Sequence, residues 1–312
     1  MVTGRIKRKQ KQQKFLHQGV MYLIVLALIL VFSFVWRSAH SHQSQNIGAL
    51  LQQNITDIEY CNGEKLDLFV PRSSKSLSVI IYIHGGGWQY GGKSDATFDI
   101  IKPLVADNFA VASINYRLSK AAEFPAQIQD VYCAVRFLRH NADQYNINSS
   151  HIGLAGISAG AHLAALAANA SKQPEFVVGP YKTESNQIQA VVSMSGVLDT
   201  ESSQLGKDTS TNLDMLLAGT AYTRRSVSPS RYLSQDDPPQ LVIYGTKDRT
   251  VSPKQSIQYV ESARAKGVDA QLLRVQNGNH NLQSFFLFRA SPNQKELTTR
   301  IADFFRQQFA AQ

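Results

Sequence analysis

The sequence contains 312 residues, of which 43% are hydrophobic and 18% charged, with 19 glycines, 10 prolines and two cysteines. This composition excludes a disordered or coiled-coil protein, which would carry more charge, and a collagen-like protein, which would carry far more glycine and proline. Two cysteines are too few for a small disulfide-rich scaffold. The length suits one large domain or two small ones, each able to bury a core.

The net charge of +9 comes mainly from the N-terminal tail. Residues 1–14 carry six Lys and Arg and no Asp or Glu, which leaves +3 for residues 15–312. Because most of the chain is nearly balanced in charge, the sequence indicates no basic groove, and we expect no nucleic-acid partner.

A predicted membrane anchor follows this tail. The 17 residues from Val20 to Trp36 carry no charge, and at about 1.5 Å per residue a helix of this length just crosses a bilayer core. We predict a transmembrane signal anchor over residues 15–37. The positive-inside bias would hold the tail at 1–14 in the cytoplasm and place the remaining chain in the periplasm, the lumen or the exterior.

The alternative is a cleaved signal peptide, which would release a secreted protein. Its apolar region is usually shorter, about 7–15 residues, and ends in a small-x-small site. Arg37 interrupts such a site here. The polar, aperiodic residues 38–56 are interpreted as a linker to a folded domain over 57–312.

Within 57–312, strand-like and helix-like segments alternate. Short β-rich runs predict strands at 66–70, 78–83, 109–115, 151–157, 189–194, 239–244 and 270–275. Helical patterns cover 125–142, 159–170, 253–266 and 293–309. Continuous apolar strands separated by helices indicate an α/β fold with a mostly parallel sheet of about eight strands covered on both faces. In such sheets, active residues gather beyond the carboxyl ends of the strands.

A serine motif lies between a predicted strand and a predicted helix. The sequence Gly156-Ile157-Ser158-Ala159-Gly160 has the G-x-S-x-G form. At a sharp strand-to-helix turn, the glycines keep side chains away so that the serine hydroxyl projects into the cleft. A plain glycine-rich turn is the alternative for the motif taken alone.

A glycine loop follows the predicted strand at 78–83. In His84-Gly85-Gly86-Gly87-Trp88, three successive glycines allow backbone N–H groups to converge on an oxyanion. A phosphate-binding loop would need G-x-G-x-x-G or G-K-[ST] leading into a helix, and neither pattern is present. We expect His84 to order the loop rather than to act as a base.

An acid and a base complete the pattern. Asp248 and His280 follow the last two predicted strands. The chain order Ser158, Asp248, His280 is that of the α/β-hydrolases and differs from the orders of the other two well-known serine-hydrolase folds. Asp199, after the strand at 189–194, is an alternative acid, and Asp248 is preferred because its short strand-end turn suits a partner for His280.

The chain from about residue 57 to 309 resembles the α/β-hydrolase superfamily, especially carboxylesterases of the hormone-sensitive-lipase-like and feruloyl-esterase-like branches. The matching segments are LDLFVP at 66–71, HGGGW at 84–88, NYRL at 115–118, GISAGAHLAA at 156–165, YGTKD at 244–248 and GNH at 278–280. The resemblance implies Ser158 as nucleophile, His280 as base and Asp248 as its orienting acid. It also implies an oxyanion hole formed by the N–H groups of Gly86, Gly87 and Ala159.

These motifs predict a serine carboxylic-ester hydrolase that acts through an acyl-enzyme, without cofactor or metal, on short-to-medium acyl esters of small molecules or lipids. The polar insertion at 201–236 is expected to supply a cap and part of the acyl pocket. Two alternatives remain open: another acyl hydrolase, such as an amidase, formamidase or peptidase, and a non-catalytic binding module. The sequence also leaves open whether Cys61 and Cys133 form a disulfide or remain free thiols.

Overall fold

The computed structural model describes residues 50–95, 98–284 and 289–311. The predicted tail at 1–14, the predicted anchor at 15–37 and most of the predicted linker lie outside these residues. Within the described part of the chain, no helix is both long enough and apolar enough to cross a membrane.

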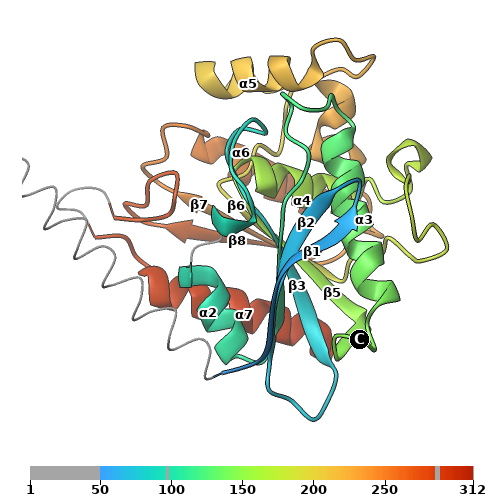
Figure 1. The fold of residues 1–312 in the computed structure, drawn as a ribbon. Helices are drawn as coiled ribbons and strands as arrows, with labels where there is room; N and C mark the ends of the chain where they lie inside the picture. Colours follow the sequence, from blue (N-terminus) through green and yellow to red (C-terminus); the bar gives the residue numbers. More distant parts are fainter. Residues whose placement is uncertain (1–49, 96–97, 285–288, 312) are drawn as a thin grey trace, which may run out of the picture. The chain divides into compact units, whose positions relative to one another are not determined.

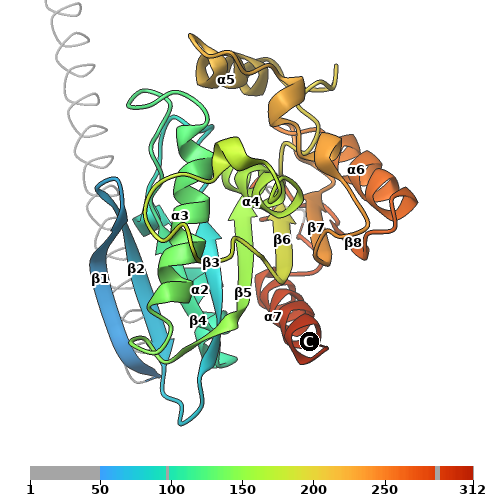
Figure 2. The same cartoon turned by 90° about the vertical axis from the view of Figure 1, so that its right-hand side faces the viewer.

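The described residues form an eight-stranded sheet with the order β1-β2-β4-β3-β5-β6-β7-β8 (Figures 1 and 2). The pairs β1–β2 and β2–β4 are antiparallel, and the remaining neighbours are parallel. This arrangement confirms the predicted, mostly parallel sheet of about eight strands. The strands are β1 (Leu51–Cys61), β2 (Glu64–Pro71), β3 (Leu77–Ile83), β4 (Ala110–Ile114), β5 (Ile147–Ile157), β6 (Ala190–Met194), β7 (Gln240–Gly245) and β8 (Ala270–Val275).

Helices cover both faces of the sheet. Helices α2 and α7 pack together on one face (Figure 1). On the other face α3 packs against α4, and α4 is joined to α6 by a hydrogen bond from Asn169 Nδ2 to Tyr259 Oη (2.7 Å). The helices are α2 (Phe98–Ala106), α3 (Ala126–His140), α4 (Ala159–Asn169), α5 (Lys207–Leu217), α6 (Pro253–Ala265) and α7 (Gln294–Ala310).

The central strands are buried on both faces, and their sequences show why. Every residue of β4 (AVASI) and β6 (AVVSM) is buried, so neither strand shows the alternation of a half-exposed strand. Small and β-branched side chains suit such positions, because helices cover both faces of a parallel sheet. Because β3 and β5 to β8 are parallel, their carboxyl ends lie at the same edge of the sheet.

The predicted boundary between linker and domain at residue 57 is wrong, because β1 begins at Leu51. This strand lies at the edge of the sheet and pairs only with β2. Edge strands are partly solvated, and register shifts between Ile55 and Ile58 interrupt the alternation of its side chains. The sequence at 51–56 therefore resembles a polar linker although it belongs to the sheet.

Helices α2 and α5 were not predicted from the sequence. Helix α2 contains Pro103, which argues against a helix at that position. Helix α5 lies in the polar insertion, and two of its apolar residues, Leu213 and Leu216, are fully buried. Figures 1 and 2 show α5 above the carboxyl edge of the sheet, beyond α4, where a cap over the site would lie.

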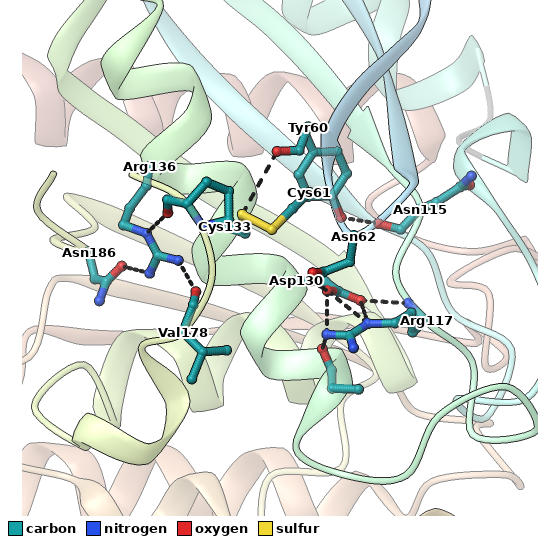
Figure 3. The surroundings of a disulfide bond; sticks show 12 residues. Tyr60, Cys61, Asn62, Asn115, Arg117, Asp130, Cys133, Arg136, Val178 and Asn186 are labelled. Atoms are coloured by element: carbon teal, nitrogen blue, oxygen red, sulfur yellow. Dashed lines mark hydrogen bonds and ion pairs between the residues drawn. A yellow bond between two sulfur atoms is a disulfide. The ribbon is translucent and has the colours of Figure 1, made fainter. Parts of the chain in front are cut away.

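A disulfide joins Cys61, at the end of β1, to Cys133 in α3, with Cα atoms 6.1 Å apart (Figure 3). It fixes the edge of the sheet to a helix and closes a loop with a sequence separation of 72 residues. Native disulfides in small domains typically contribute about 2–5 kcal/mol to stability. Of the two alternatives left open by the sequence, the structure contains the disulfide.

One turn away on α3, Asp130 is fully buried and binds Arg117 through two carboxylate oxygens, at 2.7 Å for Arg117 Nη2 to Oδ1 and 2.8 Å for Nε to Oδ2 (Figure 3). Asn62 also donates to Asp130 Oδ1 (3.1 Å). A buried carboxylate needs such partners to remain charged. This ion pair anchors the segment after β4, which in turn supports the glycine loop described below.

Candidate active site

Ser158 occupies a strained turn between β5 and α4. Its backbone angles are φ 55° and ψ −119°, and it is the residue that precedes the first turn of α4. Positive φ is costly for a residue with a side chain, and such strain gathers at functional sites. The turn is held by hydrogen bonds from Ser158 N to Met194 O (2.9 Å) and from His162 N to Ser158 O (3.0 Å).

The glycines beside Ser158 are required by backbone contacts. A Cβ on Gly160 would lie 2.1 Å from Ile83 O and 2.4 Å from His84 O. A Cβ on Gly156 would lie 2.4 Å from the carbonyl carbon of Gly160. The first turn of α4 therefore packs directly against the end of β3, with no room for a side chain. This contact brings the serine turn and the glycine loop together.

The glycine loop that follows β3 takes left-handed backbone angles. Gly86 has φ +99° and Gly87 has φ +59°, and a Cβ on Gly86 would lie 2.1 Å from Tyr90 O. The Gln89 and Tyr90 N–H groups both donate to Gly86 O at 3.1 Å, which closes the turn. The predicted oxyanion-loop residues therefore lie in a fixed turn, and a larger residue at Gly86 would clash with backbone.

The side chains of His84 and Tyr116 support this loop by ring stacking and hydrogen bonds. Their rings stack with centroids 4.3 Å apart, and Tyr116 Oη donates to His84 O (3.2 Å) and Gly85 O (3.3 Å). Burial raises the pKa of the Tyr116 hydroxyl and so keeps it protonated. Burial also lowers the pKa of His84, whose Nδ1 bonds Gly85 O at 2.8 Å. These contacts agree with the expectation that His84 orders the loop.

Trp88 connects the glycine loop to the serine helix. Although bulky, it has φ +61°, and its side chain is almost completely buried. Trp88 Nε1 donates to His162 Nδ1 (3.2 Å), so His162 must carry its proton on Nε2, which bonds Val227 O at 2.8 Å. His162 lies one helical turn beyond Ser158. It therefore links the glycine loop, the serine helix and the 201–236 insertion in one buried chain of hydrogen bonds.

Asp248 and His280 lie on adjacent loops after β7 and β8. His280 Nδ1 and Asp248 Oδ2 are 2.8 Å apart, and Asp248 Oδ1 accepts from Thr250 N (2.8 Å) and Val251 N (2.9 Å). The Asp248 side chain is 1% exposed and that of His280 21% exposed. The carboxylate thus occupies Nδ1 and leaves Nε2 of His280 as the nitrogen able to accept a proton.

Asp199, the alternative acid, has other partners. Its Oδ1 accepts from Glu201 N (3.0 Å) and from Ser228 Oγ (3.4 Å), both within the insertion. These bonds make it a turn residue that begins the insertion. The carboxylate paired with His280 is that of Asp248.

A cavity of about 260 Å³ brings the predicted site residues together. It is lined by residues of the serine turn, the glycine loop and the loop after β8. These include five of the predicted site residues, and Asp248 lies behind His280. The lining residues that the sequence singled out are Ser158, Ala159, Gly86, Gly87 and His280.

Several lining residues were missed by sequence reasoning, among them Val197, Thr250 and Asn281. Three more, Asp208, Thr209 and Asn212, come from α5 and form a polar wall of the cavity. They lie on one side of the helix, but no sequence motif marks that side as part of a site. The insertion therefore caps the site, as expected, but with polar side chains.

A second cavity of about 270 Å³ adjoins the first. Both are lined by Gly85, Gly86, Ile157 and Asn281, while the second extends toward α7 through Gln294, Leu297 and Ile301. Space is thus present on both sides of the glycine loop. Over the described residues, no group of three or more His, Cys, Asp or Glu side chains is arranged to hold a metal ion.

The buried His162 predicts a specific dependence of stability on pH. Burial lowers the pKa of His162 to about 4, against about 6.5 in an unfolded chain. The unfolded state therefore binds the proton first, so the stabilising contribution is complete above about pH 6.5 and is lost as pH falls toward 4. Replacing His162 by Gln should remove this slope, worth up to about 3 kcal/mol in the free energy of unfolding.

The measurement is urea unfolding of the wild type and His162→Gln at intervals between pH 4 and 7. His140→Gln, which removes an exposed histidine from the end of α3, is the matched control. The wild type should lose stability relative to His162→Gln as pH falls. A difference that stays constant over this range would contradict the neutral, buried state of His162.

Comparisons with known proteins identify the family of this chain. The family model BD-FAE matches residues 66–262, more than half of the chain. Esterase LipC of Mycobacterium tuberculosis is 29% identical over 205 residues, which cover 62% of this chain and 49% of the relative. The chain thus spans about half the length of that relative. Kynurenine formamidase of Danio rerio is 28% identical over 236 residues, covering 73% of this chain and 75% of the relative.

Among solved structures, a truncated carbohydrate esterase from gut microbiota superposes with a TM-score of 0.73 and 27% identity, covering 83% of this chain and 97% of that one. The shared fold is that of the α/β-hydrolases, as the sequence predicted. The chain belongs to the BD-FAE family and has the α/β-hydrolase fold.

Proposed function

We propose that the protein is a serine carboxylic-ester hydrolase in which Ser158 is the nucleophile, His280 the general base and Asp248 the residue that orients His280. The observation that carries the proposal is the 2.8 Å contact between His280 Nδ1 and Asp248 Oδ2. It stands beside a strained serine that lines the same cavity as His280. Such a constellation is recognised by geometry and roles, not by sequence position.

In the first half-reaction, His280 Nε2 removes the Ser158 proton as Oγ attacks the ester carbonyl. Asp248 holds the imidazole tautomer and stabilises its charged form. The alcohol leaves with the proton returned from His280, and a covalent acyl-serine remains. Water then gives a proton to His280 as its oxygen attacks the acyl carbon. The bond from the acyl carbon to Ser158 Oγ breaks, the acid leaves, and His280 returns the proton to Oγ.

Backbone N–H groups of Gly86, Gly87 and Ala159 would bind the negatively charged oxygen that develops during attack. Each well-placed donor typically contributes about 3 kcal/mol to lowering the barrier. Ala159 begins α4, so the partial positive charge of the helix N-terminus acts at the same point. The positive φ values of Gly86 and Gly87 support a loop fixed before substrate binds.

The size of the cavity beside Ser158 supports a preference for short-to-medium acyl groups. Its volume of about 260 Å³ lies just below the range of about 300–1,000 Å³ typical of ligand pockets. A formamide or another amide is the second candidate substrate, because a relative that aligns over 73% of this chain is a kynurenine formamidase. One experiment therefore measures both the preferred acyl length and the preference for esters over amides.

The test is hydrolysis of p-nitrophenyl esters from acetyl to dodecanoyl, together with an aryl formamide, by the wild type, Ser158→Ala and Asp248→Asn. Loss of the nucleophile should reduce kcat by about 10⁵-fold or more, and loss of the orienting carboxylate by about 10⁴-fold. Asp248→Asn keeps the size of the side chain and Ser158→Ala removes only the hydroxyl, so both variants should fold.

Thr299→Val, on the exposed side of α7, serves as the folded control with unchanged activity. Hydrolysis by Ser158→Ala at the wild-type rate would overturn the mechanism. If folded wild type cleaves the formamide and none of the esters, the formamidase alternative replaces the esterase.

We further propose that the catalytic domain lies outside the cytoplasm, with the N-terminal segment as its membrane anchor. The basic residues at 1–14 and the apolar run after them support this orientation. The buried Cys61–Cys133 disulfide adds independent support, because disulfides persist in oxidising compartments.

Alkaline phosphatase fused to the C-terminus of the full chain tests this placement, since the reporter becomes active only outside the cytoplasm, where its disulfides form. We expect an active fusion that remains with the membrane fraction. An inactive but intact fusion would contradict the orientation, and an active fusion released into the medium would favour signal cleavage.

A further inference from the structure

We propose that Asn212, in the cap helix α5, donates a hydrogen bond from its side-chain amide to an oxygen of the substrate that lies close to the reacting carbonyl. The proposal rests on the hydrolase function above and adds a specificity-determining residue to it. It predicts a preference for esters that carry an ether, hydroxyl or carbonyl oxygen near the scissile bond.

The first observation is the position of the amide nitrogen. A Cβ on Gly87 would lie only 2.4 Å from Asn212 Nδ2, so this nitrogen lies against the backbone of the glycine loop. Asn212 and Gly87 both line the cavity that contains Ser158. A substrate whose carbonyl oxygen reaches the Gly87 N–H group therefore brings its neighbouring atoms close to Asn212.

The second observation is that the orientation of the amide is fixed. Gln89 Nε2 donates to Asn212 Oδ1 at 2.8 Å, and Gln89 is 5% exposed. An amide presents one acceptor oxygen and one donor NH₂ group. Gln89 Nε2 also reaches Met215 Sδ (3.7 Å), a weak acceptor, and this contact orients the Gln89 amide. With the Gln89 NH₂ group toward Asn212 Oδ1, the NH₂ group of Asn212 faces Gly87. The cavity wall at this point is thus a hydrogen-bond donor.

The third observation is that α5 is held firmly where it carries Asn212. Leu213 and Leu216, which follow Asn212 in the same helix, are fully buried. Gln89 itself belongs to the turn that follows the glycine loop, two residues beyond Gly87. The donor is therefore preorganised by the loop that it stands beside, which is the arrangement that gives a bound polar group its specificity.

The two other polar side chains of the α5 wall, Asp208 and Thr209, do not offer a hydrogen-bond donor to the substrate. Thr209 Oγ1 already donates to Thr250 O (3.1 Å), and Asp208 offers only acceptors when ionised. Within the α5 wall of the cavity, Asn212 is thus the side chain that supplies an N–H group. A substrate with only CH₂ groups at this position would leave that N–H group without a partner and would lose affinity in the transition state.

The acceptor oxygen can belong to the acid or to the alcohol of the ester, and two isosteric pairs separate these sources. On the acid side, p-nitrophenyl methoxyacetate is compared with p-nitrophenyl butyrate. On the alcohol side, 2-methoxyethyl butyrate is compared with butyl butyrate. In each pair one ether oxygen replaces one methylene, and the ratio of kcat/KM values within a pair is the quantity measured.

The variants are Asn212→Leu, which removes the donor, and Asn212→Asp, which keeps the acceptor for Gln89 and replaces the donor by a second oxygen. In one of the two pairs, Asn212→Leu should lower the ratio by about 2-fold to about 10-fold, the range that one hydrogen bond supplies. Asn212→Asp should lower it further. Because ratios are compared between proteins, the different intrinsic reactivity of the two esters cancels.

Gln89→Met tests the orientation separately. It leaves Asn212 in place but removes the donor that fixes its amide, so the same ratio should fall by a smaller factor. Thr211→Val, at an exposed position of α5, is the matched control and should leave both ratios unchanged. Thermal unfolding of each variant checks its fold, and Gln89→Met decides the outcome should the Asn212 variants fail to fold.

The inference is overturned if Asn212→Leu and Gln89→Met change both members of each pair by the same factor, as they would if Asn212 only held the cap in place. That result would leave the proposed function intact. If the wild type hydrolyses none of the four esters, the proposed esterase function itself fails, so the two failures are distinguishable.

Discussion

The site depends on one close backbone contact, that of the first turn of α4 with the end of β3. With Gly160 against the carbonyl oxygens of Ile83 and His84, the strand that leads into the glycine loop and the helix that follows the serine cannot move independently. Any side chain at this position would separate them. The position of Ser158 relative to Gly86 and Gly87 is therefore set by packing of main chain on main chain, which is more rigid than a contact between flexible side chains.

Buried polar side chains then secure the parts that this contact brings together. Tyr116 and His84 brace the glycine loop from below, and the chain Trp88–His162–Val227 ties it to α4 and to the insertion. The ion pair Asp130–Arg117 fixes the segment that carries Tyr116. Such networks rigidify a site when their members have partners. In the part of the chain that the structure describes, His84 Nε2 is buried without a hydrogen-bond partner, whereas His84 Nδ1 bonds Gly85 O. The strained backbone at Ser158 and Trp88 persists because the surrounding structure holds it.

Most of the fold could be predicted from the sequence, because seven of the strands contain short β-rich runs bounded by turn residues. Strand β1 could not, since edge position and register shifts remove its alternation. Helix α5 could not be predicted either, because few of its residues are buried and most of its surface is polar. Both misses have the same cause: these elements obtain their stability from tertiary contacts rather than from a local pattern.

The residues of the candidate site that directly follow strands could be predicted from the sequence. The serine turn, the glycine loop and the loops with Asp248 and His280 all come directly after parallel strands of the sheet, so topology brings them to one edge. Asp208, Thr209 and Asn212 approach the same cavity from a distant insertion. Their contribution depends on how the cap folds back over the sheet, and no local motif reports that. The disulfide is a similar case, because its two cysteines are joined only by the packing of β1 on α3.

Covalent labelling shows directly whether Ser158 is a nucleophile that His280 activates. A fluorophosphonate that mimics the tetrahedral intermediate should react once per chain, and peptide mass spectrometry should find the label on Ser158. The His280→Ala variant should react far more slowly while remaining folded. Labelling at another residue, or equal labelling of Ser158 in wild type and His280→Ala, would contradict the account.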